Sequence, residues 1–190
     1  MSKRCQILDY QPSIPNKNGF TLIELIVVFT VIAVLSAIGV VSFVNYTHAQ
    51  NLNQSANDLL NSLNTAKALS TSQLKSLTKN GQLQECQSYE TLNGYGIKIN
   101  TAQHAYSLYM VCSANGTLPT NLDSSSNLWK ITLADDIAFD TSKNNITNVF
   151  FPVLSGAVVT NGSGNADTIA LTSYGMEKII KITQGYLKLQ

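Results

Sequence analysis

The chain has 190 residues, a length that suits one domain with at most one accessory segment and argues against a multidomain enzyme. Only 12% of the residues are charged, about half the usual share for a soluble protein, whereas 44% are hydrophobic. The net charge is +1, and beyond Gln50 nine lysines face nine carboxylates, so the sequence carries no electrostatic footprint for nucleic acid. We therefore expect no nucleic-acid partner.

The first element is an apolar run from Leu25 to Val44, twenty residues without a charge. At about 1.5 Å per helical residue this run spans the roughly 30 Å of hydrocarbon in a bilayer. The segment before it carries Lys3, Arg4 and Lys17. Because basic residues stay on the cytoplasmic side, the pattern predicts a single transmembrane helix with a cytoplasmic N-terminus and an exported remainder.

A cleaved secretory signal peptide is the alternative reading of this run. Thr47, His48 and Ala49 offer a small-x-small cleavage site. The apolar run is, however, longer than the usual signal core of about 7 to 15 residues, and the basic segment before it is also long. The membrane anchor is therefore the favoured interpretation.

Glu24 stands at the head of the apolar run. An ionised carboxylate costs a few kcal/mol when it is left unpaired in lipid. Either Glu24 lies at the interface, where water solvates it, or a positive charge compensates it. The residues around Glu24 favour the second interpretation.

Residues 17–24 read KNGFTLIE and lead directly into the apolar run. This string resembles the class III signal of type IV prepilins and type II secretion pseudopilins. The resemblance implies that a prepilin peptidase cleaves between Gly19 and Phe20 and methylates the new amine of Phe20. It also implies that Glu24 of one subunit pairs with the Phe20 amine of its neighbour during assembly on an inner-membrane platform. The implied partners are other pilin subunits, this peptidase, the platform and membrane lipid.

The apolar run departs from many major pilins, which carry a proline in its second half. Ile38, Gly39, Val40, Val41 and Ser42 occupy that stretch here. Gly39 and Ser42 offer a softer kink. The departure favours a minor over a major subunit.

An amphipathic helix is expected from Asn51 to Thr78. Its apolar residues recur at spacings of three or four: Leu52, Ala56, Leu59, Leu60, Leu63, Ala66, Leu69, Leu74 and Leu77. Since the sequence has no proline between Phe20 and Leu118, this helix can continue the membrane span without a break. Asn80 and Gly81 predict a helix stop or a turn.

The rest of the chain predicts short antiparallel strands. Nine runs have the composition or alternation of half-buried strands: Tyr95 to Ile99, Tyr106 to Cys112, Trp129 to Leu133, Ile137 to Phe139, Val149 to Val153, Ala157 to Thr160, Thr168 to Thr172, Lys178 to Ile182 and Tyr186 to Leu189. The expected fold is α+β, with a long N-terminal helix packed on an antiparallel β domain. The expected organisation is a removable leader (1–19), a transmembrane and assembly helix (20–47), an amphipathic helix (48–79) and an exported β domain (80–190).

The C-terminal third carries a second resemblance. Its order of strands and glycines, from Phe150 and Gly156 to Gly185 and Tyr186, is similar to the general secretion pathway protein H and FimT group of minor pseudopilins. This resemblance implies a sandwich-like β domain on the pilin helix.

Two cysteines, Cys86 and Cys112, lie in the part expected to be exported, whereas Cys5 belongs to the leader. Two exported thiols favour a disulfide, and two unbridged buried cysteines are the alternative. The closed loop of 112 − 86 = 26 positions is worth about 3.5 kcal/mol in the loop-entropy account.

Asp135, Asp136, Asp140 and Asn144 form a weak candidate calcium site, because such oxygen ligands suit Ca²⁺. The segment lacks the glycine and the final glutamate of an EF-hand loop, so a solvated turn is the simpler interpretation. Neither histidine, His48 or His104, lies in a metal or nucleophile motif. We expect no catalytic residue, no bound metal and no cofactor.

The sequence therefore predicts a non-enzymatic structural subunit, a minor pilin or pseudopilin, in the inner membrane and then in a filament or at the cell surface. A major pilin is the alternative in the same class. An alternative from a different class is a signal-anchored surface binding module or hydrolase. A third possibility is a competence pseudopilin that touches DNA.

Overall fold

The computed structural model describes residues 19–74, 76–79, 82–114, 126–162, 167–183 and 186–190. Within them, the side chains at positions 37–39, 41, 76–79, 82–84 and 126 are not described. The leader up to Asn18, with Cys5, and the predicted turn at Asn80 and Gly81 lie outside the described residues. The chain divides into two compact units, residues 1–43 and residues 44–190.

The N-terminal element is one unbroken helix, α1 (Leu22–Ser72), as the absence of proline predicts. It ends six positions (78 − 72) before the predicted end at Thr78, so that boundary is wrong. Gln73, with a φ of 52°, takes the left-handed conformation that stops a helix. In the last turn, hydroxyl groups turn back onto the helix: Thr71 Oγ1 donates to the carbonyl of Ala68 at 2.9 Å and Ser72 Oγ to that of Leu69 at 3.1 Å.

All nine predicted strands are present. In chain order the strands are β1 (Ser76–Lys79), β2 (Gln82–Glu85), β3 (Thr91–Asn100), β4 (Ala105–Ser113), β5 (Ser126–Thr132), β6 (Ala138–Phe139), β7 (Asn148–Pro152), β8 (Val159–Thr160), β9 (Asp167–Ser173), β10 (Met176–Thr183) and β11 (Tyr186–Leu189). The hairpin of β1 and β2 was not expected, because the leucines of residues 74–77 continue the helical spacing.

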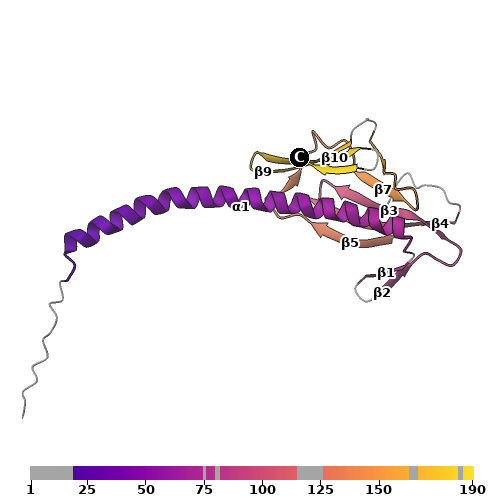
Figure 1. The fold of residues 1–190 in the computed structure, drawn as a ribbon, viewed down its shortest axis with the longest axis horizontal. Coiled ribbons are helices and arrows are strands. Elements are labelled where there is room, and N and C mark those ends of the chain that lie inside the picture. Colours follow the sequence, from indigo (N-terminus) through magenta and orange to yellow (C-terminus); the bar gives the residue numbers. More distant parts are fainter. Residues whose placement is uncertain (1–18, 75, 80–81, 115–125, 163–166, 184–185) are drawn as a thin grey trace, which may run out of the picture. The chain divides into compact units, whose positions relative to one another are not determined.

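Within the described residues every strand pair is antiparallel, and these strands form three sheets. The largest sheet has the order β5-β4-β3-β7-β8, the second β11-β10-β9-β6, and the third consists of β1 and β2. The predicted α+β fold, a helix packed on antiparallel sheets, is confirmed within the unit of residues 44–190 (Figure 1).

The main core lies between the second part of α1 and the two larger sheets. The helix contributes Leu52, Ala56, Leu59, Leu63 and Ala66, each at most 1% exposed. These side chains cluster with buried residues of both larger sheets, among them Tyr95, Tyr106, Leu108, Phe151, Ile169 and Ile180. The amphipathic stripe of the sequence is thus the buried face of the helix.

Gly94 in β3 allows two backbones to approach closely. A Cβ atom there would lie 2.1 Å from the carbonyl oxygen of Phe151 and 2.7 Å from the ring of Phe150. The register of β3 shifts between Leu92 and Gly94, as at a β-bulge. Only glycine fits at this position, where β3 pairs with β7.

Asparagine side chains continue the ladder of β9 beyond the two-residue strand β6. The backbone N–H of Asp140 donates to the carbonyl of Ala170 at 3.0 Å. The Asn144 amide then bonds to both the N–H and the C=O of Ala170, and Asn145 Oδ1 accepts from the N–H of Thr168 at 2.8 Å. Side-chain amides therefore satisfy backbone groups that a longer strand would otherwise pair.

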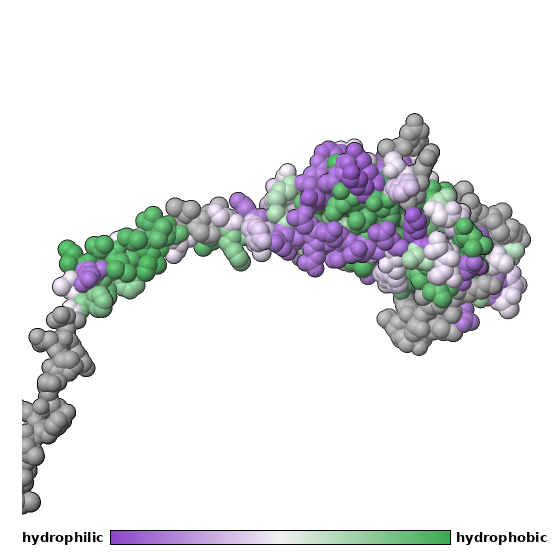
Figure 2. Space-filling view, viewed as in Figure 1, coloured by the Kyte–Doolittle hydropathy of each residue, from purple (hydrophilic) through white to green (hydrophobic). Residues whose placement is uncertain are grey.

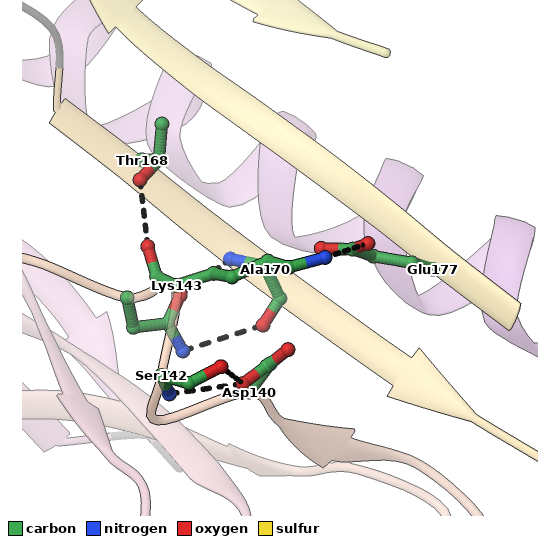
Figure 3. A network of polar contacts seen from close by, with 7 residues as sticks. Asp140, Ser142, Lys143, Thr168, Ala170 and Glu177 are labelled. Atoms are coloured by element: carbon green, nitrogen blue, oxygen red, sulfur yellow. Dashed lines mark hydrogen bonds and ion pairs between the residues drawn. The ribbon is translucent and has the colours of Figure 1, made fainter. Parts of the chain in front are cut away.

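The same loop is tied to β9 and β10 by further polar contacts (Figure 3). Thr168 Oγ1 donates to the carbonyl of Lys143 at 2.8 Å, and the Lys143 ammonium pairs with the Glu177 carboxylate. This ion pair raises the pKa of Lys143, chiefly through the hydrogen bond to Glu177. These polar contacts hold residues 140–145 against β9 and β10.

Candidate functional site

The predicted processing site lies immediately before α1. Gly19 and Phe20 are non-helical, and both are exposed. A Cβ atom placed on Gly19 would meet nothing within 4 Å, and the Phe20 side chain is 81% exposed. Among the described residues, nothing shields the peptide bond that joins these two residues.

Thr21 caps the N-terminus of α1. Its hydroxyl oxygen accepts a hydrogen bond from the backbone N–H of Glu24 at 3.3 Å, and its carbonyl accepts from the N–H of Leu25 at 3.2 Å. Threonine followed three residues later by glutamate is the sequence of a capping box, and Glu24 lies in the first turn, where the helix dipole favours a negative charge. The sequence interpretation missed Thr21, although this local pattern was enough to find it.

Glu24 lies on an otherwise apolar face of the helix. A shallow hollow of about 220 Å³ is lined by Phe20, Glu24, Leu25, Val28 and Phe29, which the helical repeat places on one side. Apart from the carboxylate of Glu24, the lining side chains are apolar. A positive group of another molecule that entered the hollow would therefore meet one negative charge in surroundings of low polarity, where ion pairing is strong.

The large apolar side chains described between Leu22 and Val44 of α1 point outward. Leu22 is 77% exposed, Phe29 62% and Phe43 66%. Figure 2 shows hydrophobic residues over much of the visible face of this segment. Such a continuous apolar surface marks a contact with a membrane or with another protein.

Across the part of the chain that the structure describes, no helix qualifies by length and hydropathy as a membrane span. The transmembrane helix over residues 25–44 stays a prediction.

Cys86 and Cys112 are joined in a disulfide, with an S–S distance of 2.09 Å and a Cα–Cα distance of 5.6 Å. Both cysteines are half-buried and pack against the main core. The bridge ties the segment after β2 to strand β4.

The three aspartates of the calcium hypothesis have different surroundings. Asp135 is exposed, Asp136 Oδ2 lies 2.9 Å from His48 Nδ1, and Asp140 Oδ1 accepts from the hydroxyl of Ser142 at 2.6 Å (Figure 3). Hydrogen bonds from His48 and from Ser142 hold the pKa of Asp136 and of Asp140, respectively, below the ordinary value. Within the described ranges, no three His, Cys, Asp or Glu side chains lie together as a metal site would need. The geometry therefore gives the calcium hypothesis no support.

His48 connects α1 to two parts of the β domain. Besides the contact with Asp136, its ring centroid lies 4.0 Å from that of Tyr174. Tyr174 and Gly175 form the two-residue turn between β9 and β10, and both have positive φ, of 46° and 79°. No local pattern reveals a contact between residues 88 positions apart, so the sequence could not find it. His104, the other histidine, is exposed in the turn between β3 and β4.

Comparison with protein families gives a match over residues 14–40, to the family described as the prokaryotic N-terminal methylation motif. The chain therefore carries a type IV prepilin-like class III signal, and the resemblance seen in residues 17–24 is confirmed. The motif supports a pilin-like or pseudopilin subunit of structural rather than enzymatic character. It implies processing by a prepilin peptidase, a membrane-anchored N-terminus and assembly with other pilin subunits.

Comparison with curated proteins and with solved structures yields no significant match. The family match ends at residue 40, so the likeness of the C-terminal third to the general secretion pathway protein H and FimT group stays a prediction.

Proposed function

We propose that this protein is a minor pilin or pseudopilin, a structural subunit that is cleaved between Gly19 and Phe20 and then assembled into a filament through the N-terminal part of α1. The methylation motif at residues 14–40 is the observation that carries the proposal. The exposed junction before the helix and the outward-facing apolar side chains of α1 support it.

The assembly contact is the pairing of Glu24 with the N-terminal amine of Phe20 on a neighbouring subunit. On its own helix Glu24 lies in an apolar hollow, where no described side chain supplies a positive charge. The new amine of Phe20 is a cation that cleavage creates at the corresponding end of each neighbour. Because each charge is costly alone in apolar surroundings, pairing them fixes the register between subunits.

Before assembly, the apolar part of α1 resides in the inner membrane, with the leader in the cytoplasm and the β domain exported. The basic residues of the leader support this orientation. The disulfide between Cys86 and Cys112 agrees with an oxidising compartment.

The mass and N-terminal sequence of the protein from its native membranes test the proposal. The expected chain begins at Phe20 and carries one additional methyl group on its amine. A chain that begins at Met1 would indicate a plain anchor, and one that begins at Gln50 a secreted domain. Either result would contradict the assembly role of Glu24 together with the processing.

Copy number separates the minor subunit from the alternative, a major pilin. Sheared filaments are resolved by electrophoresis, and the bands are quantified. A minor subunit is scarce relative to the main band, whereas a major pilin is the main band. If the protein is processed but absent from every sheared filament, the alternative of a surface binding module outside filaments is favoured.

A further inference from the structure

A polar hollow of about 210 Å³ lies on the five-stranded sheet, over β3, β4 and β5. Ile97, Tyr106 and Leu108 of these strands belong to the main core. Since successive side chains of a strand point to opposite faces, Lys98 and Ser107 lie on the face turned away from that core. The hollow is therefore separate from the core.

The strand register creates the hollow by placing a small residue between two long ones. Lys98 of β3 is directly opposite Ser107 of β4, and Ser107 is directly opposite Lys130 of β5. With neighbouring strands about 4.8 Å apart, the two lysine backbones stand about 10 Å apart across this row. The next row includes Gly96, which has no side chain. Space therefore remains above Ser107, and the side chains of Lys98 and Lys130 flank it.

A β-bulge sets the chemistry of the next row. Trp129 is opposite Leu108, so a regular ladder would place Leu128 opposite Tyr109. The register shifts at this point, and Asn127 takes that place instead. The bulge therefore brings an amide to the hollow and leaves Leu128 buried in the core, a use typical of bulges beside binding sites.

The polar rim of the hollow is held in place by its own contacts. Lys130 Nζ donates to Gln103 Oε1 at 2.7 Å, and the backbone N–H of Gln103 donates to Asn100 Oδ1 at 3.0 Å. The ring of Tyr109, on the opposite side, packs against the small cluster of Val111 and Phe150. Groups that are ordered before binding lose less entropy when a ligand arrives.

We propose that this hollow binds one acidic sugar unit, a monosaccharide that bears a carboxylate. Two lysines line it, and none of the described lining residues is acidic, so a single anion is favoured. The remaining lining groups are amides and hydroxyls, which both donate to and accept from sugar hydroxyls: Asn100, Gln103, Asn127, Ser107 and Tyr109. The volume is below the roughly 300 to 1,000 Å³ of pockets for drug-sized ligands, which fits one ring rather than a chain.

Direct titration of the detergent-solubilised full chain tests this site, with glucuronate as the probe and glucose, inorganic phosphate and N-acetylglutamate amide for comparison. Glucuronate is expected to bind more tightly than the other three, and to bind less tightly as salt is added. Lys130→Gln and Lys98→Gln should each weaken the binding of glucuronate by about tenfold or more. Lys188→Gln, at an exposed position of β11, is the matched control and should leave it unchanged.

Ser107→Leu fills the hollow while it keeps both lysines, and it should abolish the binding of glucuronate. The circular dichroism spectrum and the thermal midpoint of each variant establish whether it is folded. If Lys130→Gln does not fold, Lys98→Gln alone tests the role of the lysines. Equal binding of glucose would overturn the role of the lysines. Binding of phosphate as tight as that of glucuronate would reveal a general anion site. Binding of N-acetylglutamate amide tighter than that of glucuronate would reveal a peptide site. Either result would overturn the proposal. Lack of binding by all four probes would do the same. None of these outcomes depends on cleavage at Gly19 or on assembly.

Discussion

The two parts of α1 on either side of Val44 share one secondary structure but differ in what covers their apolar side chains. In the N-terminal part, Phe29 and Leu35 are 62% and 64% exposed, whereas Leu59 and Leu63 in the second part are completely buried. The first part is apolar around the helix, and the second only along one stripe. A stripe can be covered by the chain's own sheets, but an apolar surface around the whole helix needs lipid or other subunits.

The largest expected effect concerns the charge on the N-terminal part. Glu24→Gln keeps the size of the side chain and the hydrogen bond of its backbone to Thr21, but removes the negative charge. Incorporation into sheared filaments should fall by about a hundredfold or more. The Phe20 amine of the neighbouring subunit would then be a buried charge without a partner, which costs about 3 to 5 kcal/mol. The measurement is the ratio of filament to membrane protein in immunoblots.

The control for Glu24→Gln is Glu177→Gln, which breaks the ion pair with Lys143 in the β domain. This variant should enter filaments normally. Normal incorporation of Glu24→Gln would remove the assembly contact from the proposed function.

Truncation on the two sides of Val44 tests the comparison directly. Leu59→Ala should lower the free energy of unfolding by about 2 to 5 kcal/mol, since it leaves a cavity in the core. Phe29→Ala should leave the unfolding of the β domain unchanged, because its ring is exposed. Trp129, the single tryptophan, packs against the core and reports denaturant unfolding by its fluorescence. Equal destabilisation by the two variants would contradict the distinction between the exposed N-terminal part of α1 and its buried second part.

The disulfide should supply the next largest stabilisation. Cys86→Ala combined with Cys112→Ala should lower the free energy of unfolding by about 3.5 kcal/mol, from the larger entropy of the unbridged unfolded chain. The same fluorescence titration measures it. Cys5→Ala, in the leader, is the control and should have no effect. A double variant as stable as the original would mean that the bridge contributes nothing.

The asparagine contacts along β9 should contribute less. Asn144→Ala removes the side-chain acceptor of the N–H of the fully buried Ala170, at a cost of about 1 to 3 kcal/mol, whereas the Ala170 carbonyl keeps its hydrogen bond from the N–H of Asp140. Amide hydrogen exchange at Ala170 should accelerate in parallel. Asn57→Ala, on an exposed face of α1, should change stability by less than about 0.5 kcal/mol. Unaltered exchange at Ala170 would show that the amide contacts do not hold this edge.

The smallest expected effect is a loss of folding stability at low pH. The hydrogen bond from His48 holds the pKa of Asp136 below its ordinary value of 3.8. A group whose pKa is lowered by folding stabilises the fold above its unfolded pKa, and this contribution disappears as the pH falls through the folded pKa. Stability should therefore decline below about pH 4, and Asp136→Asn should make the decline shallower. Denaturant midpoints between about pH 6 and pH 3 measure the decline in the original protein and in the variant. If stability falls equally steeply with pH in the two proteins, Asp136 is not a source of the acid dependence.

Most of the predictions that depended on local pattern agree with the structure. Composition or alternation identified the nine predicted strands, and the three-four spacing identified the buried stripe that runs from Leu52 to Ala66. The same spacing continued into Leu74 and Leu77 and placed the end of the helix too late. A periodic pattern of apolar residues does not specify the left-handed conformation of Gln73 that ends α1.

The sequence by itself determined the class III signal, because the peptidase motif and the apolar run are contiguous, and it determined the types of most elements, because these follow from short-range periodicity. Only the tertiary structure decided which distant residues meet. The contact of His48 with Asp136 and the row of Lys98, Ser107 and Lys130 depend on strand register and on the crossing of helix and sheets. A shift of two residues in the register would keep each side chain of that row on its face but change the residues opposite it, and nothing in the local sequence specifies that choice.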